Sequence, residues 1–423
     1  MQNLAQSDSR VSLQTVAELL QERTPPRPAE GDQDLQRRLN IAGLVYNTWT
    51  ARGSQQEVLA ERLLDGTADA LRSFAFSYDD FVRDFMAPNR PVIIQGVTDG
   101  WQARTAWVTA DGGVDIDALA AAYGDARVAA VDAPRGWEGG CRERRELSLR
   151  EYAAWWRRRA AGQEAGALYV KDWHFAAEFP GAKAFSTPPC NPDSGAGSPA
   201  TAGADDGERK PCQREGLATS DYRFVYLGPA GSHTALHADV LRSFSWSVNV
   251  CGRKLWRLLP PEHTPLLLDR FGRDMPPCLP CADTPCDAAA AEGFPNLAAA
   301  APHVVTVVQE AGEAIFVPSG WHHTVVNLAD TLSVNANWLN AFNVHWAGGL
   351  LRREHAQAAA AIEDCRESCS SAAEFEALVQ RNLAANAGMG YAGFASLVAA
   401  MAARELRCLR KRLPLANARA LLP

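Results

Sequence analysis

Short β-prone segments separated by turns fill the chain between Tyr222 and Trp338, and this region constrains the fold more than any other. The segments are rich in β-branched and aromatic residues, which favour an extended backbone. Strands at this spacing favour a double-sheet barrel over alternating βα units. We therefore predict a mainly β core with strands at 223–227, 235–240, 245–250, 254–259, 304–308, 314–317, 324–327 and 332–338.

Helices are expected on both sides of this β region. Capping patterns at Ser77–Asp80, Ser148–Glu151 and Ser371–Glu374 each precede a run with apolar residues on one helical face. Such patterns satisfy the free N–H groups of a first helical turn. Residues 91–96 and 167–172 are apolar segments of strand length. The predicted fold class is α+β, mainly β with flanking helices.

Composition divides the chain into three parts. Residues 1–70 are polar and form an N-terminal extension that is predicted to be partly disordered or helical. Residues 71–343 hold the core, and residues 344–423 form a C-terminal helical region. Within the core, residues 186–218 are rich in Pro, Gly, Ser and Ala and poor in large apolar side chains. That composition predicts a disordered insert.

Charge and apolar content narrow the function classes. A net charge of −7 over 423 residues argues against a protein whose main partner is a phosphate backbone, so no direct nucleic acid partner is expected. No stretch approaches the ~18–20 apolar residues of a membrane span, and the N-terminus shows no signal peptide pattern. The 10 cysteines are scattered. Reduced thiols of this kind predict a cytoplasmic location, with a nuclear one as the alternative.

Three of the cysteines, Cys278, Cys281 and Cys286, lie close together in a Pro-rich stretch. Structural zinc usually takes four ligands, and no fourth candidate lies nearby in the sequence. His263 or His303 would complete a set if the chain folded back. Zinc binding by these cysteines stays an open alternative to plain surface thiols.

His237-Ala-Asp239 is the first candidate for chemistry. On a strand, positions i and i+2 point to the same face, so the imidazole and the carboxylate would project into one space. With one more histidine they would form the 2-His-1-carboxylate triad of non-haem Fe(II) oxygenases, which leaves coordination positions open. Alone, the pattern is weak, because most such triplets are polar surface residues.

A second candidate segment runs from Gly312 to Asn327. An apolar strand leads into a Pro-Ser-Gly turn, an aromatic residue and then His322 and His323. Adjacent strand residues face opposite sides, so one of these histidines at most can face a metal ion shared with His237. The alternative for either histidine is a turn residue with an ordinary hydrogen bond.

Together these motifs, with Gly252-Arg-Lys-Leu-Trp256 between them, resemble the JmjC oxygenases of the cupin superfamily. The resemblance spans roughly residues 75–405. It implies a double-stranded β-helix, or jelly-roll, core that uses Fe(II), 2-oxoglutarate and O2. It implies His237, Asp239 and His323 as the metal ligands and catalytic residues, with His323 preferred over His322 because it aligns with the family's second histidine.

The same resemblance assigns the cosubstrate. It implies that Lys254 binds the distal carboxylate of 2-oxoglutarate, because that dianion needs a fixed positive charge at the far end of the pocket. Thr234 and Tyr169 match residues that help to hold this carboxylate, although Tyr169 would equally suit a half-buried strand. Ser247 departs from the family's asparagine, and Asn335 stands where relatives have threonine, so Asn335 is assigned to cosubstrate binding.

Segments such as Lys171–His174 and Arg242–Trp246 resemble one subgroup of the family, the JmjC-only lysyl hydroxylases. The implied substrate is a lysine of the eukaryotic peptide-chain release factor in translation termination. Alternatives are N-methyl-lysine demethylation, a cupin-fold binding protein without turnover and, less favoured, RNA modification. A monomer and a homodimer are both compatible with the C-terminal helices, and no membrane partner is expected.

Overall fold

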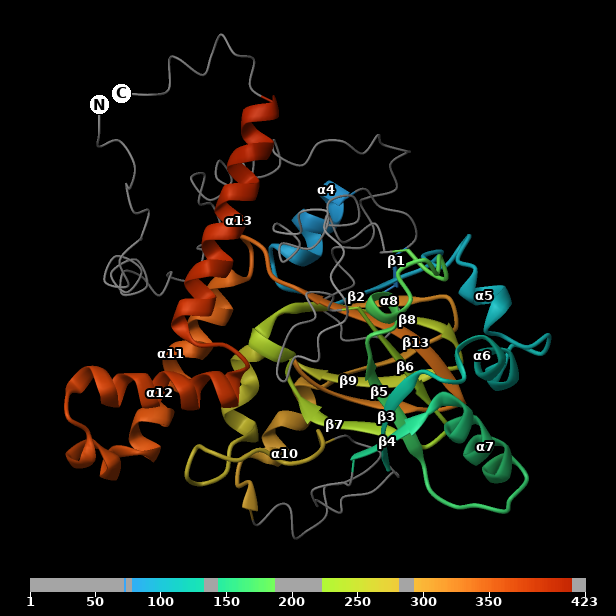
Figure 1. Cartoon of the computed structure of the whole chain (residues 1–423), viewed down its shortest axis with the longest axis horizontal. Coiled ribbons are helices and arrows are strands. Elements are labelled where there is room, and N and C mark those ends of the chain that lie inside the picture. Colours follow the sequence, from blue (N-terminus) through green and yellow to red (C-terminus); the bar gives the residue numbers. More distant parts are fainter. Residues whose placement is uncertain (1–71, 74–77, 133–143, 187–222, 281–292, 413–423) are drawn as a thin grey trace, which may run out of the picture. The chain divides into compact units, whose positions relative to one another are not determined.

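The computed structural model describes residues 72–73, 78–132, 144–186, 223–280 and 293–412 (Figure 1). These residues fall into two compact units, with the boundary between Asn343 and Val344. Several predictions lie outside the described residues: the extension 1–70, the capping residue Ser77, Cys281, Cys286 and nearly all of the expected insert at 186–218.

The first unit is built on two sheets, and the predicted jelly-roll architecture with flanking helices is confirmed (Figure 1). All strand pairs are antiparallel except β1 with β2. The large sheet has the order β1 (Arg72–Ser73), β2 (Val92–Ile94), β11 (Ala314–Val317), β8 (Phe244–Cys251), β13 (Thr331–Trp338), β6 (Arg223–Gly228), β5 (Leu168–Trp173), β3 (Arg127–Asp132) and β4 (Arg144–Ser148). The small sheet has the order β10 (Val305–Gln309), β9 (Lys254–Leu259), β12 (His322–Asn327) and β7 (His233–His237).

One predicted strand is wrong at its end. The segment expected at 235–240 is β7, which begins at His233 and ends at His237. Asp239 has φ −54° and ψ 150° and precedes a 3-10 turn, η5 (Val240–Arg242). Leu241 and Arg242 both have φ of 52°, a left-handed conformation that non-glycine residues rarely adopt. The chain therefore leaves the strand sharply, just after the first candidate ligand.

Helices pack on one face of the large sheet, where a single apolar core joins them to the strands. The capping box at Ser148 and Glu151 is confirmed and opens α7. Tyr152 of this helix is fully buried, and its hydroxyl donates to the carbonyl oxygens of Leu168 and Leu227 at 2.9 and 3.0 Å. Among the described residues, the helices before β6 are α4 (Tyr78–Phe81), the π-helix η2 (Val82–Met86), α5 (Ala103–Ala106), α6 (Ile116–Tyr123), α7 (Leu149–Ala160) and α8 (Phe175–Glu178).

The space between the two sheets is partly apolar and partly polar. One part is closed by a second core cluster, made of Ile93, Trp256, Leu258, Val307, Ile315, Val317, Trp321 and Val325. Neighbouring inward positions on β8 and β13 carry Ser and Asn instead, among them Ser245, Ser247, Ser333 and Asn335. Buried polar groups must be hydrogen-bonded or serve a ligand, so this polar part is where a site is expected.

The segment after β9 carries η6 (Pro261–Leu267), α10 (Leu297–Ala300) and η7 (Ala301–His303), which share a small core of leucines.

The second unit consists of α11 (Val344–Ala361), η8 (Glu363–Ser368), α12 (Ala372–Ala387) and α13 (Tyr391–Arg412). Ser371 caps α12 as predicted, since its side chain accepts from the Glu374 N–H. Among the described residues no single helix has the length and apolar character of a membrane span, and only α12 taken with residues 391–403, across a 66° bend, meets both criteria.

Candidate metal and cosubstrate site

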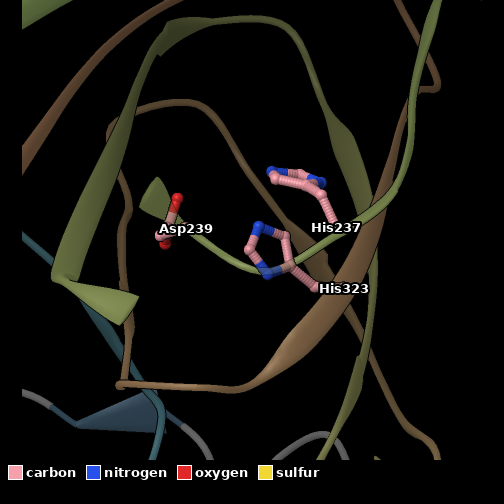
Figure 2. Close-up of side chains that lie close together, drawn as sticks. All are labelled: His237, Asp239 and His323. Atoms are coloured by element: carbon pink, nitrogen blue, oxygen red, sulfur yellow. The ribbon is translucent and has the colours of Figure 1, made fainter. Parts of the chain in front are cut away.

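Two strands of the small sheet bring the candidate ligands together. His237 at the end of β7 is the register partner of His323 on β12, and their ring centroids lie 4.2 Å apart. Asp239, just beyond β7, turns its carboxylate toward both rings (Figure 2). The ligand atoms of the three residues all lie within 4.8 Å of one another, close enough to share one metal ion.

Backbone hydrogen bonds set the orientation of both imidazoles. Nδ1 of His237 lies 2.9 Å from the carbonyl oxygen of Ala235, and Nδ1 of His323 lies 3.0 Å from that of Trp321. A carbonyl oxygen only accepts, so each Nδ1 carries the proton, and each Nε2 has its lone pair available for a metal ion. Burial, and then the neighbouring His323, lowers the pKa of His237 to about 4, which keeps it neutral near pH 7.

The carboxylate is oriented by the large sheet. The Ser245 hydroxyl, on β8, donates to Oδ2 of Asp239 at 2.6 Å. A bond of this kind fixes which oxygen faces the histidines, as the outer hydrogen bonds of metal centres commonly do. Ser245 has no role in the sequence prediction, although one signal was present. Serine alternates with large buried residues in Phe244-Ser-Trp-Ser-Val248, so the polar positions share one strand face.

His322, the other candidate ligand, points away from the cluster. Its Nε2 accepts from Arg242 at 3.3 Å, and its Nδ1 lies 3.1 Å from the hydroxyl of Thr264. Burial and the charge of Arg242 lower its pKa to about 3. The structure thus places His323, and not His322, with His237 and Asp239. His322 instead links the turn after Asp239 to η6.

Lys254 lies inside the barrel and is 2 % exposed. Its Nζ donates to the Ser333 hydroxyl at 2.6 Å, and the described residues offer it no carboxylate. Burial, together with repulsion from Lys171, lowers its pKa to about 7. An ammonium group held this way is stabilised by an incoming anion, because the anion replaces the missing counter-charge.

Tyr169 and Thr234 are linked to this lysine through Asn327, which is the register partner of Lys254 on β12. The cosubstrate role that the resemblance implies for them stays a prediction. The buried Tyr169 hydroxyl is within hydrogen-bonding reach of Asn327 and Thr234, and burial raises its pKa. Gly228 makes room for the ring, since a Cβ there would lie 2.5 Å from Cδ2 of Tyr169. A phenol and a hydroxyl beside a lysine can share the oxygens of one carboxylate.

Thr234 faces inward only because β7 is irregular. On a regular strand, residues three apart face opposite sides. In β7, Thr234 pairs with Val325 and His237 with His323, so two residues on β7 lie opposite the single Thr324. This β-bulge turns both Thr234 and His237 into the barrel.

Asn335 acts on Lys254 indirectly, through a hydrogen-bonded serine. Its Oδ1 accepts from the hydroxyls of Ser247 at 2.9 Å and Ser333 at 3.3 Å, and Ser333 in turn accepts from Lys254. Ser247 and Asn335 are register partners on β8 and β13. The two departures from the family pattern therefore compensate for each other, because the serine and the asparagine complete one hydrogen-bonded chain.

Lys171 is a second cation in the pocket that the sequence prediction gave no role. Its Nζ lies 3.0 Å from the Thr234 hydroxyl and 4.9 Å from the centroid of the Tyr169 ring. Its charge contributes to the lowered pKa of both His237 and Lys254. No spacing rule would have placed it there, because it lies at a second irregularity, in β5.

The proposed zinc site is only partly described. His263 and His303 do meet, with rings stacked at a centroid distance of 3.6 Å. Cys278 is described, whereas Cys281 and Cys286 lie outside the described residues. Within the part of the chain that the structure describes, the one group of three or more metal-ligating side chains is His237, Asp239 and His323.

The donor set fits the group that the motifs predict. Two imidazoles and one carboxylate are a facial triad suited to Fe(II), and the buried lysine fits an anionic cosubstrate that also reaches the metal. These residues can hold a dication and a dianion side by side, with the opposite charges neutralising one another.

Comparison with known proteins agrees with this geometry. A family model described as a cupin-like domain matches residues 78–344. The arginine-specific demethylase JMJ20 of Arabidopsis thaliana is 39% identical over 330 residues, covering 78% of this chain and 69% of that protein. The human 2-oxoglutarate and iron-dependent oxygenase JMJD4 is 36% identical over 341 residues, covering 80% and 76%. The JMJD4 homolog of Drosophila melanogaster is 31% identical over 366 residues, covering 79% and 78%.

Proposed function

The chain belongs to the cupin-like JmjC family of 2-oxoglutarate- and iron-dependent oxygenases, and from this premise we propose that it hydroxylates a lysine side chain of the eukaryotic peptide-chain release factor. The observation that carries the oxygenase activity is the cluster of His237, Asp239 and His323 in the same barrel as a buried Lys254 to which the described residues offer no carboxylate. The reaction class is that of a dioxygenase, and its cofactors are Fe(II), 2-oxoglutarate and O2.

The roles of the residues follow from their positions. His237, Asp239 and His323 would hold Fe(II), with Ser245 orienting the carboxylate. Lys254, Tyr169 and Thr234 would hold the distal carboxylate of 2-oxoglutarate. When bound, the metal, the cosubstrate and O2 supply an oxidation strong enough for an unactivated C–H bond. The protein's own part is orientation and charge placement, so no side chain has to act as a general base.

The choice of a lysine in the release factor is supported by local sequence. The segments Lys171–His174 and Arg242–Trp246 resemble the lysyl hydroxylase subgroup, and Arg242–Trp246 is the specific part, because general JmjC proteins need not carry it. Proteins named JMJD4 from human, chicken and mouse are among the similar proteins. A release factor acts in the cytoplasm, so we propose that location for this chain.

A second candidate is N-methyl-arginine demethylation, favoured by the name of the similar plant protein JMJ20. The chemistry is the same up to the hydroxylated carbon, because hydroxylation of an N-methyl group releases formaldehyde. N-methyl-lysine demethylation would proceed in the same way. The three activities differ in the product, and not in the metal site.

The deciding experiment measures succinate release from 2-oxoglutarate by the Fe(II)-loaded protein, with and without recombinant release factor. Mass spectrometry of the release factor should show the mass of one added oxygen atom on a lysine, and Asp239→Ala should abolish it. Formaldehyde release from a dimethyl-arginine peptide, without that mass gain, would favour demethylation. Iron binding without any turnover would favour a cupin-fold binding protein.

A further inference from the structure

Strand β5 contains a bulge just after Tyr169, one of the candidate cosubstrate residues. Val170 pairs with Leu227 and Trp173 pairs with Val225, so Lys171 and Asp172 together lie opposite the single residue Tyr226. Asp172 has φ of 54°, a left-handed conformation that costs energy for most residues and that aspartate tolerates better. Bulges next to active sites commonly re-aim a side chain, and this one re-aims two.

The two residues of the bulge carry opposite charges. Lys171 extends toward Thr234 and Tyr169 at the cosubstrate end. Asp172 is exposed, and one of its oxygens, Oδ1, accepts a hydrogen bond from the Tyr226 hydroxyl. A carboxylate has about four acceptor sites on its two oxygens, so this bond leaves capacity for further N–H donors.

Tyr226 lies within electrostatic reach of both Asp172 and the candidate metal ligand Asp239. Burial, and next the charge of Asp172, raise the pKa of the Tyr226 phenol, with a smaller contribution from Asp239. The phenol therefore stays protonated and donates to Asp172 at physiological pH. Among the described residues, Asp172 and Asp239 are the two carboxylates that act on this phenol. Because Asp239 is the candidate metal ligand, Asp172 is the one available to a substrate.

The balance of charges in the pocket indicates a role for Asp172. With a metal dication and a 2-oxoglutarate dianion bound, their charges cancel, so the charges of nearby protein side chains would decide which substrate side chain is favoured. Lys171 and Lys254 disfavour a cationic side chain. The exposed carboxylate of Asp172, next to Lys171 in the chain, offsets this repulsion.

We propose that Asp172, held by Tyr226, is the anionic anchor that selects a cationic side chain and sets its position relative to the metal ligands. The inference rests on the proposed function in so far as that function names a lysine substrate. The ligand chemistry is an alkylammonium group, and Asp172 binds it by a charge-assisted hydrogen bond. Tyr226 is a positioning residue, since it acts through Asp172.

The first test is the substitution Asp172→Asn. It keeps the size of the side chain and the tolerance of a positive φ, and it removes only the charge. For the release factor substrate, KM should rise about tenfold, as expected for loss of one charge-assisted bond, while kcat changes less than about threefold. The affinity for 2-oxoglutarate, measured from the charge-transfer absorbance of the anaerobic Fe(II) complex, should stay within about twofold, since Lys254 is untouched.

Two further variants serve as a comparison and a control for this result. Tyr226→Phe removes the hydroxyl that holds Asp172 and should raise KM by about threefold. Asp125→Asn removes an exposed carboxylate that pairs with Arg150 at 2.9 Å, outside the site, and should leave KM unchanged. An unchanged KM in Asp172→Asn would overturn the anchor.

A second test does not depend on the release factor. Saturation-transfer NMR on the Zn(II)- and N-oxalylglycine-loaded protein compares n-butylammonium with neutral n-butanol. Selective binding of the cation that is lost in Asp172→Asn supports the anchor, even if the release factor proves not to be turned over. Selectivity that persists in Asp172→Asn, or its absence from the wild-type protein, overturns the anchor, even if the release factor is hydroxylated.

Discussion

The two sheets of the barrel contribute to the site in different ways. The small sheet carries or leads into the groups that would contact the metal and the cosubstrate directly, namely Thr234, His237, Asp239, Lys254 and His323. The large sheet supplies mainly side chains that orient them, among them Ser245, Ser333 and Asn335. The difference suggests that variants in the small sheet should abolish a function, and variants in the large sheet should weaken it.

The largest effect is expected for Asp239→Ala. Two histidines alone hold Fe(II) weakly, so iron content measured by elemental analysis should fall to background and succinate release below detection. The thermal unfolding midpoint should change little, because Asp239 lies in a turn. Full iron content in this variant would contradict the assignment of the ligand.

Lys254→Met should separate the cosubstrate from the metal. The affinity for 2-oxoglutarate should fall about a hundredfold, because a buried charge-assisted contact is lost, while iron content stays unchanged. The variant should also melt about 2 °C higher at neutral pH, since a buried cation without a carboxylate partner is replaced by an apolar side chain. A lower melting temperature with unchanged affinity would show that Lys254 has a structural role instead.

Ser245→Ala tests the orienting role of the large sheet. Loss of the bond to Asp239 should weaken Fe(II) affinity about 10- to 100-fold and leave turnover detectable at saturating iron. Ser319→Ala is the matched control, because Ser319 is fully buried and its hydroxyl has no hydrogen-bond partner among the described residues. If both variants bind iron equally well, the distinction between the sheets fails.

The smallest effect is a dependence on pH. Burial, and then the charge of Lys171, lower the folded pKa of Lys254 to about 7. The protonated form binds the dianion, so affinity should be highest below pH 7 and fall by up to about tenfold from pH 7 to 8. Stability should move the other way, rising with pH between about 7 and 10, because the unfolded chain then binds more protons.

Both trends should vanish in Lys254→Met, when affinity is titrated by charge-transfer absorbance and stability by thermal melting. A 2-oxoglutarate affinity that rises from pH 7 to 8 would contradict the assignment of Lys254. A flat stability profile in the wild-type protein would show that the lysine stays charged in the folded state.

The sequence determined the β-rich core, most strand bounds to within one residue and the residues that meet at the metal site. The predicted segment 254–259 coincides with β9 and 314–317 with β11, because hydrophobic alternation and turn residues are local signals. The family resemblance, and not periodicity, selected His323 over His322 and assigned Lys254, Thr234 and Tyr169 to the cosubstrate.

Only the tertiary structure decided where the chain departs from regular strands. Asp239 reaches His237 from a turn and not from a strand, and the bulge in β7 brings Thr234 to the same face as His237. The bulge in β5 turns Lys171 and Asp172 toward Tyr226. A period of two predicts faces only while pairing stays regular, and a bulge depends on the register of a distant partner strand, which no local pattern encodes.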